Sequence, residues 1–198
     1  MKFKIHNLNR QYDGFMKIDI MDVEYDRFNG ETIRATREIM ERGDGVAVLL
    51  YESESASILF TRQFRIPTAE RDIMEGYEDA GWLLELPAGS FQLGNEEPRD
   101  AAVREVEEEL GYHVHDLQHV YTFYVSPGSC SERIHLFYAT VSASQKRSQG
   151  GGLVEEQEDI QMIKLPVSEI DNLIANGTIR DAKTMIGWMW WKLHQQRG

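Results

Sequence analysis

Cysteine is almost absent from this chain of 198 residues, which contains only Cys130. A single cysteine cannot form a disulfide within the chain, so the disulfide-rich folds of small secreted proteins are excluded. Such a composition is typical of a reducing compartment, and we expect a cytoplasmic protein. The first residues, MKFKIHNLNR, also lack the apolar stretch of a secretion signal, which agrees with this expectation.

Positive charge and long apolar runs are scarce as well. The chain has 21 Lys and Arg against 33 Asp and Glu, which gives a net charge of -12. A surface of this sign repels a phosphate backbone, so we expect no nucleic-acid partner. No apolar run approaches the roughly 20 residues that a membrane helix needs, so we expect no membrane partner. The 41% hydrophobic content is nevertheless enough for a globular domain with a sizeable core.

The residues that are present predict a mixed α/β (α+β) fold. Alternating apolar and polar residues on both sides of Asn29-Gly30 predict an antiparallel β hairpin within residues 16–37. Further strands are expected at 45–51, 57–67, 82–89, 117–128, 132–143 and 158–166, and helices at 98–111, 168–177 and 179–196. Strands mixed with a few helices favour one central sheet with helices on both sides.

Two polar segments are expected to lie outside this regular structure. Residues 68–81 are predicted to form an exposed acidic loop, and residues 144–157 a long flexible loop. The hairpin precedes the central sheet, so we divide the chain into an amino-terminal strand module, residues 1–44, and a main domain, residues 45–198.

The helix at 98–111 lies in the most informative segment, GNEEPRDAAVREVEEELGY. At about 100° per residue, Glu105, Glu108 and Glu109 fall on one face, while Glu107 lies away from them. The apolar residues fall on a different face, which can pack on a sheet: Ala102, Val103, Val106 and Leu110. Like charges at these spacings repel one another by a few tenths of a kcal/mol per pair. Arg104 alone cannot neutralise the three carboxylates.

This glutamate face therefore favours a bound cation. Carboxylate oxygens without a neighbouring thiolate are typical ligands of Mg²⁺ or Mn²⁺. The alternative is an ordinary solvated acidic face, which is common on helices.

The order of the residues resembles the Nudix box, a motif that combines a glycine, a glutamate and the sequence Arg-Glu-aliphatic-x-Glu-Glu-x-Gly. The matching positions are Glu96, Arg104, Glu105, Val106, Glu108, Glu109, Gly111 and Tyr112. One feature departs from the motif, because the loop from Gly89 to Glu96 is longer by one residue. The agreement fixes several residue identities along one segment, so it is far more specific than a lone glycine motif.

The resemblance implies a Nudix α/β/α sandwich with an added hairpin module, and a metal-dependent hydrolase of nucleoside diphosphates linked to another group. In such enzymes the helix binds divalent metals, here Mg²⁺ with Mn²⁺ as a possibility. The implied metal ligands are Glu105, Glu108, Glu109 and the backbone carbonyl of Ala88. The implied supports of the helix are Gly89, Glu96, Arg104 and Gly111, with an ion pair between Glu96 and Arg104.

Segments outside the box, such as RQFRIP and VSPGSCSER, resemble the ADP-ribose and nucleotide-sugar pyrophosphatase branch of that family. Members of this branch form homodimers that exchange their amino-terminal strands. The implied reaction is hydrolysis of ADP-ribose, or a related nucleotide sugar, to AMP and ribose 5-phosphate. GDP-mannose is the main rival substrate, since GGGLVEEQEDI also resembles GDP-mannose hydrolases.

The same resemblance implies four substrate-binding residues: Phe15, Arg37, Arg65 and Glu132. Phe15 would stack on the nucleobase, the arginines would contact phosphates and sugars, and Glu132 would lie near the terminal sugar. Phe15 could instead be a core aromatic, and Arg65 could belong to a surface salt bridge, which contributes little to stability. Arg62 competes with Arg65 for the same role.

A general base must accept a proton from the attacking water. The resemblance implies that this base lies in the glycine-rich loop GGGLVEEQEDI, which we expect to act as a mobile lid. The candidate bases are Glu156 and Glu158, with Glu155 as an alternative to Glu156. Glu105 is also expected to be a catalytic residue, because it is an implied ligand of the metal. A solvated Gly and Glu linker is the competing interpretation.

Two functions of other classes remain open. A Nudix-fold sensor would bind a nucleotide without cleaving it, but the retention of Glu105, Glu108 and Glu109 argues against this alternative. An acidic module that docks on a basic protein would show no dependence on metal.

Overall fold

The structure is a computed structural model that describes residues 2–91 and 94–195. The chain divides into two compact units. The first comprises the residues up to Asp44 together with Phe123–Arg133, and the second comprises Gly45–Thr122 and the residues from Ile134 onward. The amino-terminal module expected at residues 1–44 therefore lies in the first unit. This unit also includes a later segment that the sequence assigned to the main domain.

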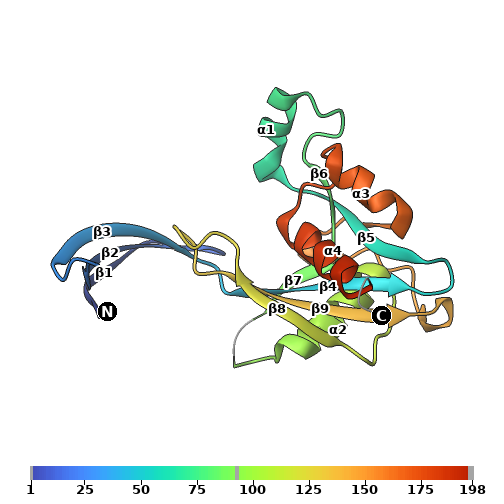
Figure 1. The fold of residues 1–198 in the computed structure, drawn as a ribbon, viewed down its shortest axis with the longest axis horizontal. Coiled ribbons are helices and arrows are strands. Elements are labelled where there is room, and N and C mark those ends of the chain that lie inside the picture. The colour runs from blue at the N-terminus through green and yellow to red at the C-terminus, as the bar shows by residue number, and fades with distance from the viewer. Residues whose placement is uncertain (1, 92–93, 196–198) are drawn as a thin grey trace. The chain divides into compact units, whose positions relative to one another are not determined.

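The first unit contains a three-stranded antiparallel sheet of β1 (Phe3–Asp13), β2 (Lys17–Asp26) and β3 (Thr32–Glu41) (Figure 1). The predicted hairpin is confirmed as β2 and β3, with a left-handed Gly30 in its loop. The sequence did not predict β1. The pairing of β1 with β2 shifts register between Ile5 and Asn7 and again between Arg10 and Tyr12, and these shifts interrupt the period of two that marks a strand.

The second unit is built on a seven-stranded sheet in the order β10-β5-β4-β9-β8, with β6 paired to β5 and β7 paired to β4. Its strands are β4 (Asp44–Glu52), β5 (Ser57–Phe64), β6 (Trp82–Glu85), β7 (Ala88–Phe91), β8 (Gln118–Tyr124), β9 (Arg133–Val141) and β10 (Gln161–Pro166). Strands β4 and β9 are parallel, whereas β5 is antiparallel to β4, β6 and β10. The sheet is therefore of mixed strand direction, and it is the central sheet that the sequence predicted.

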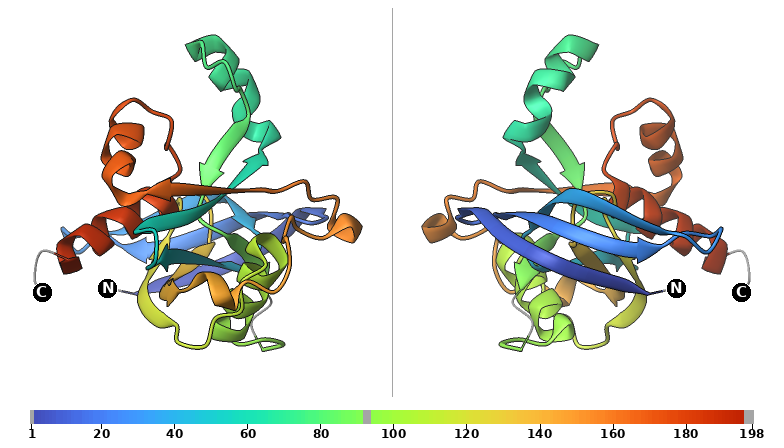
Figure 2. Two further views of the ribbon diagram at one scale, coloured as in Figure 1. Left: turned by 90° about the vertical axis from the view of Figure 1, so that its right-hand side faces the viewer. Right: turned by 90° about the vertical axis from the view of Figure 1, so that its left-hand side faces the viewer.

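Helices cover both faces of this sheet (Figures 1 and 2). Helix α2 (Pro98–Leu110) buries Val106 and Leu110 in one core cluster with Val46 and Val48 of β4. Helix α4 (Ala182–Gln195) lies on the opposite face, where the ring centroids of Trp191 and Tyr51 are 5.5 Å apart. Alternate residues of β4 thus pack on different helices. The predicted α/β/α sandwich is confirmed.

Two further helices flank the sheet, α1 (Ile66–Glu75) and α3 (Val167–Ala175). The exposed loop predicted at residues 68–81 is wrong, because α1 occupies its first half. Pro67 suits the first turn of this helix and Gly76 ends it with a φ of 83°. Asp72, in the middle of α1, is buried and accepts hydrogen bonds from the Gly81 backbone (2.9 Å) and the Arg180 guanidinium (2.7 Å). Within the described ranges, no helix is both long and apolar enough to cross a membrane.

Candidate active site

The candidate site forms where the connection from β6 to β7 meets α2. The backbone N–H of Ala88 donates a hydrogen bond to Oε2 of Glu109 at 2.9 Å. A Cβ at Gly89 would overlap the carboxylate of Glu105, so only glycine allows this approach without displacement. The segment Pro-Ala-Gly and two glutamates of α2 are therefore packed directly against each other.

Local sequence signals place the helix in this position. Pro98 occupies the first turn of α2, and Gly111 ends it in the left-handed conformation with its N–H bonded to the carbonyl of Glu107 at 3.0 Å. The buried stripe of Val106 and Leu110 fixes the rotation of the helix on the sheet. Glu105 and Glu109 then point inward, with 7% and 1% of their surface exposed.

Burial makes these carboxyl groups hard to ionise. It raises the pKa of Glu105 to about 7, against the opposing effect of Arg104, and the charges of Glu108 and Glu158 add to the rise. Burial also raises the pKa of Glu109 well above its ordinary value, and the neighbouring charge of Glu105 acts in the same direction. A cation at this position would favour the ionised form of both groups.

Arg104 is the cation that contacts this cluster. Its Nε and Nη2 pair with the two oxygens of Glu96 at 3.2 Å each. Its Nη1 lies 2.7 Å from Oε1 of Glu105 and 2.9 Å from Oε2 of Glu108. The guanidinium thus joins the glutamate before the helix to two glutamates on it. Residues 92–93, in the lengthened loop, lie outside the described residues, but Glu96 still reaches Arg104.

The donor set fits a hard divalent cation, although the ligands are not assembled around one point. Among the described residues, no group of three Asp, Glu, His or Cys side chains is arranged to hold a metal ion. Glu105 and Glu108 share Arg104, whereas Glu109 is turned to Ala88. Carboxylate oxygens are nevertheless the donors that Mg²⁺ and Mn²⁺ prefer. A bound dication would offset the cost of burying Glu105 and Glu109 as anions.

The glycine-rich segment after β9 packs on the end of α2. The backbone N–H groups of Gly151 and Gly152 donate to the carbonyls of Glu109 (2.9 Å) and Glu108 (3.1 Å). A Cβ at Gly150, which has a φ of 68°, would overlap the carbonyl of Glu109. We expected these glycines to give a lid its freedom, but here they allow the backbone to satisfy the last carbonyls of the helix.

This docking separates the three candidate bases. Glu158 is half-buried, accepts a hydrogen bond from the Leu153 backbone at 3.0 Å, and its charge raises the pKa of both Glu105 and Glu109. Glu155 and Glu156 are exposed on a short 3₁₀ turn, Val154–Glu156. Of the three, only Glu158 therefore has a described interaction with the helix carboxylates.

Arg65 lies close enough to Glu109 for its charge to lower the pKa of that carboxyl, against the larger effect of burial, and it belongs to a charge network around the buried Glu85. Its Nε and Nη2 bond to the two oxygens of Glu85 at 3.0 and 3.1 Å, and Lys183 reaches the same carboxylate at 2.6 Å. Lys183 also bonds to Asp181 at 3.1 Å. Arg62, the competing residue, forms a half-exposed pair with Asp79. Glu85, Asp181 and Lys183 were not predicted from the sequence. The signal for Asp181 was present, since it accepts the Thr184 N–H as a helix-capping residue does.

The other predicted substrate contacts belong to the first unit. Phe15 is 79% exposed, so it is not the core aromatic of the alternative interpretation. Arg42 lies over its ring, with the guanidinium carbon 5.8 Å from the centroid, and pairs with Glu132 at 3.5 Å. Arg42, which was not predicted from the sequence, thus connects two predicted contacts. Arg37 donates to Tyr25 and to the Thr36 carbonyl, and no described contact joins it to Phe15.

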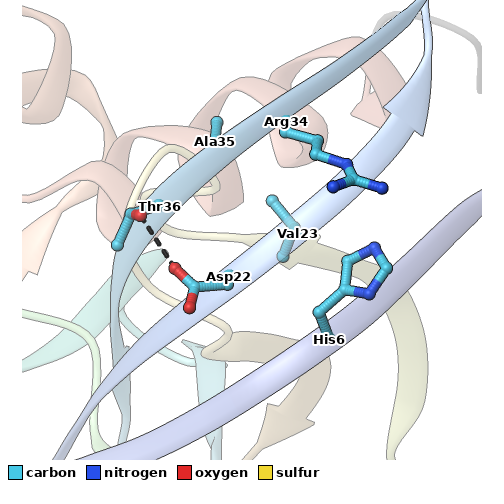
Figure 3. A pocket seen from close by; sticks show the side chains of 6 residues that line it. All are labelled: His6, Asp22, Val23, Arg34, Ala35 and Thr36. Atoms are coloured by element: carbon cyan, nitrogen blue, oxygen red, sulfur yellow. Dashed lines mark hydrogen bonds between the residues drawn. The ribbon is translucent and has the colours of Figure 1, made fainter.

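A hollow on the sheet of the first unit has different chemistry (Figure 3). Its lining residues are His6, Asp22, Val23, Arg34, Ala35 and Thr36. The charged side chains there have partners within the sheet. Asp22 accepts a hydrogen bond from the Thr36 hydroxyl at 2.8 Å, and Arg34 forms an ion pair with Glu24 at 2.6 Å. It therefore offers a phosphate group no cluster of unpaired positive charge.

Comparisons with known proteins show the family and the fold of the chain. The family model described as "NUDIX domain" matches residues 41–186. A relative named GDP-mannose pyrophosphatase from Citrobacter koseri is 39% identical over 169 residues, which cover 84% of each chain. A protein of the same name from Escherichia coli O1:K1 / APEC is 37% identical over 174 residues, 88% of this chain and 86% of the other. A solved structure described as an ADP compounds hydrolase shares the fold, with a TM-score of 0.75 and 18% identity over 99% of this chain and 95% of that one.

Proposed function

The chain belongs to the Nudix family, in its ADP-ribose and nucleotide-sugar pyrophosphatase branch, and we propose that it hydrolyses the diphosphate bond of a nucleotide sugar. The single observation that carries this proposal is the burial of Glu105 and Glu109 against Ala88 and Gly89. Burial disfavours the ionised form of both carboxyl groups, so this arrangement does not favour stability. It is suited to binding a cation.

GDP-mannose is the substrate that we propose first. The sequence alone favoured ADP-ribose, with GDP-mannose as the rival. The relatives at 37–39% identity, which align with most of this chain, are named GDP-mannose pyrophosphatases, and this reverses the order. The ADP compounds hydrolase supports the fold only, at 18% identity. ADP-ribose therefore stays as the competing arm of the experiment.

The proposed metal ligands are Glu105, Glu108, Glu109 and the carbonyl of Ala88. When bound, a divalent cation, Mg²⁺ in the first instance, would neutralise charge on the diphosphate and lower the pKa of the attacking water. When the metal binds, Arg104 would retain its ion pair with Glu96 and lose its hydrogen bonds to Glu105 and Glu108, because the oxygens of those two glutamates are needed as metal ligands. The fork between Arg104 and Glu96 uses separate nitrogens, so it can persist.

Glu158 is the proposed general base, because its charge already acts on Glu105 and Glu109. Water attacks one phosphorus, the bond from that phosphorus to the bridging oxygen breaks, and Glu158 takes the proton of the water. GDP-mannose would give GMP and mannose 1-phosphate. Arg65 would contact the diphosphate from the side of β5, where its guanidinium is held by Glu85.

We also propose a homodimer that pairs through the amino-terminal strands. The first unit exposes large apolar side chains that a single chain leaves in water, including Phe3 (76%), Leu8 (50%) and Phe28 (95%). Exposed apolar groups in this number favour a protein contact. Phe15, Arg37 and Glu132 would then complete a site together with a second copy.

The test is hydrolysis of GDP-mannose and ADP-ribose by the purified chain, with Mg²⁺ and with EDTA, followed by separation of the nucleotide products. We expect GMP from GDP-mannose, more slowly formed AMP from ADP-ribose, and no product in EDTA. Turnover that persists in EDTA would exclude the metal site. If neither nucleotide sugar is cleaved while the intact nucleotide still binds, the chain is a sensor and the proposed enzyme is wrong.

A further inference from the structure

Glu85, the last residue of β6, is the centre of the charge network beside the site. It is 3% exposed, yet it meets two cations: Arg65 through a fork at 3.0 and 3.1 Å, and Lys183 at 2.6 Å. Burying an isolated carboxylate is costly, and two cationic partners on one carboxylate keep it ionised. Lys183 is itself fixed, since it also bonds to Asp181 at 3.1 Å.

The network is joined to the site by short covalent and hydrogen-bonded paths. Glu85 precedes Ala88 by three positions, and the Leu86 N–H between them donates to the Thr184 hydroxyl at 2.9 Å. The positive charge of Arg65 also acts on Glu109, whose pKa it lowers against the larger effect of burial. Arg65 therefore lies near the carboxylates that are proposed to bind metal.

Among the described residues, Glu85 is the one whose side chain forms hydrogen bonds with the Arg65 guanidinium, so Glu85 sets its orientation. The fork uses Nε and Nη2, so the edge that carries Nη1 points away from Glu85. The Arg65 side chain remains 38% exposed, whereas that of Glu85 is 4% exposed. One side of the guanidinium is thus anchored in the protein while the other is accessible to a ligand, an arrangement suited to a diphosphate.

We propose that Glu85 is a positioning residue for the reaction, which orients Arg65 toward the diphosphate and acts on the substrate only through that arginine. Lys183 serves as the second cation that holds Glu85 in its ionised form. This inference rests on the proposed nucleotide-sugar hydrolysis and deepens it. It assigns a role in substrate binding to a strand residue outside the metal helix.

The competing explanation is an ordinary buried ion pair, and the chain contains a matched control for it. Glu52 ends β4, is 1% exposed and pairs with Lys164 at 2.7 Å. Glu52→Gln therefore removes a carboxylate of similar burial from a lysine pair in the same sheet, and no described contact joins Glu52 to Arg65. A general loss of stability should affect both variants alike, whereas a loss of positioning should affect Glu85→Gln alone.

The experiment compares kcat and KM for GDP-mannose in the wild type, Glu85→Gln and Glu52→Gln, with thermal unfolding of each. We expect KM to rise about tenfold or more in Glu85→Gln while kcat changes little, because an oriented arginine contributes binding to ground state and transition state alike. KM in Glu52→Gln should stay within about twofold of the wild type. Equal KM values in the two variants would overturn the proposal.

Two further variants test the path through Arg65. In the double variant Glu85→Gln/Arg65→Lys, KM should not exceed that of Arg65→Lys, because lysine has no fork for Glu85 to orient. Additive effects would overturn the proposal.

Glu85→Asp keeps the charge but withdraws it by one methylene, so it covers the case in which Glu85→Gln does not fold. We expect a smaller rise in KM, and an unchanged KM in folded Glu85→Asp would overturn the proposal. If the wild type cleaves no nucleotide sugar, the proposed function fails first, which separates the two failures.

Discussion

Gly89 faces the carboxylate of Glu105 so closely that a Cβ on this glycine would overlap the carboxylate oxygens. The contact joins β7 to α2 at the point where the Ala88 N–H also reaches Glu109 at 2.9 Å. The φ of Gly89 is not in the left-handed region, so glycine is required at this position for space rather than for backbone conformation. Position 89 therefore sets how near Glu105, a proposed metal ligand, can come to the Pro-Ala-Gly segment.

Replacement of Gly89 by alanine tests this relationship. The added methyl group must displace Glu105 or β7, and overpacking of this kind lowers the free energy of unfolding by about 1–3 kcal/mol. Misplacement of a catalytic group by about 1 Å reduces the rate roughly a hundredfold. We expect kcat/KM for GDP-mannose to fall by that factor, as measured by release of GMP. Gly128→Ala is the control, since a Cβ there meets nothing within 4 Å; equal losses in both variants would contradict the explanation.

Glu109→Gln should separate activity from stability. Glu109 is 1% exposed, so the ionised form carries a large desolvation cost in the absence of metal. Glutamine keeps an acceptor for the Ala88 N–H but cannot ionise. We expect hydrolysis to fall at least a hundredfold, while the free energy of unfolding in EDTA at pH 8 rises by roughly 1 kcal/mol. Urea denaturation and the product assay measure the two effects.

Glu107→Gln provides the matched control on the same helix. The Glu107 side chain is 43% exposed and pairs with His113 at 3.2 Å. We expect unchanged activity and a change in unfolding free energy within about 0.5 kcal/mol. A stabilised Glu109→Gln that retains full activity would remove Glu109 from the proposed ligand set.

Much of the site helix could be predicted from the sequence because its signals are local. Pro98, Gly111 and the apolar stripe of α2 define both its ends and its rotation, and the glutamates follow from that register. The same kind of signal was present for α1 in Pro67 and Gly76, but the acidic composition of residues 68–81 suggested a loop. Composition was a weaker guide there than the residues at the helix ends.

The remaining features depend on contacts between distant segments, which periodicity does not report. Glu85 and Lys183 are 98 positions apart, and their pairing requires α4 to lie on the sheet. The docking of the three glycines on α2 likewise became visible only when the carbonyls of Glu108 and Glu109 were located. In both cases the residue types were evident in the sequence, whereas their partners were not.

The loop glutamates allow a direct comparison of two neighbouring residues. Glu158 is half-buried near Glu105 and Glu109, whereas Glu156 is exposed on the 3₁₀ turn. Loss of a general base costs about 10²–10⁴ in rate. We expect kcat to fall by that range in Glu158→Gln and to stay within about twofold in Glu156→Gln. The reverse pattern in steady-state kinetics would assign the base to Glu156.

The dependence of stability on pH provides a prediction that does not involve substrate. The pKa of Glu105 is about 7 in the folded protein and 4.5 in the reference state, so the native state binds an extra proton between these values. Unfolding free energy falls with rising pH wherever the native state holds more protons. The contribution of Glu105 is therefore fully present below pH 4.5 and is lost as pH rises through about 7. Glu109, whose pKa is also raised, acts in the same direction.

In EDTA, we accordingly expect the wild type to become less stable between pH 6 and pH 8, as measured by urea denaturation. Glu105→Gln cannot ionise at this position, so its loss of stability over the same range should be smaller, with the remainder due to Glu109 and other titrating groups. Saturating Mg²⁺ should reduce the loss in the wild type, because the cation binds the ionised carboxylates of the folded state. Parallel pH profiles for the wild type and Glu105→Gln in EDTA would show that Glu105 ionises in the folded protein as it does in water.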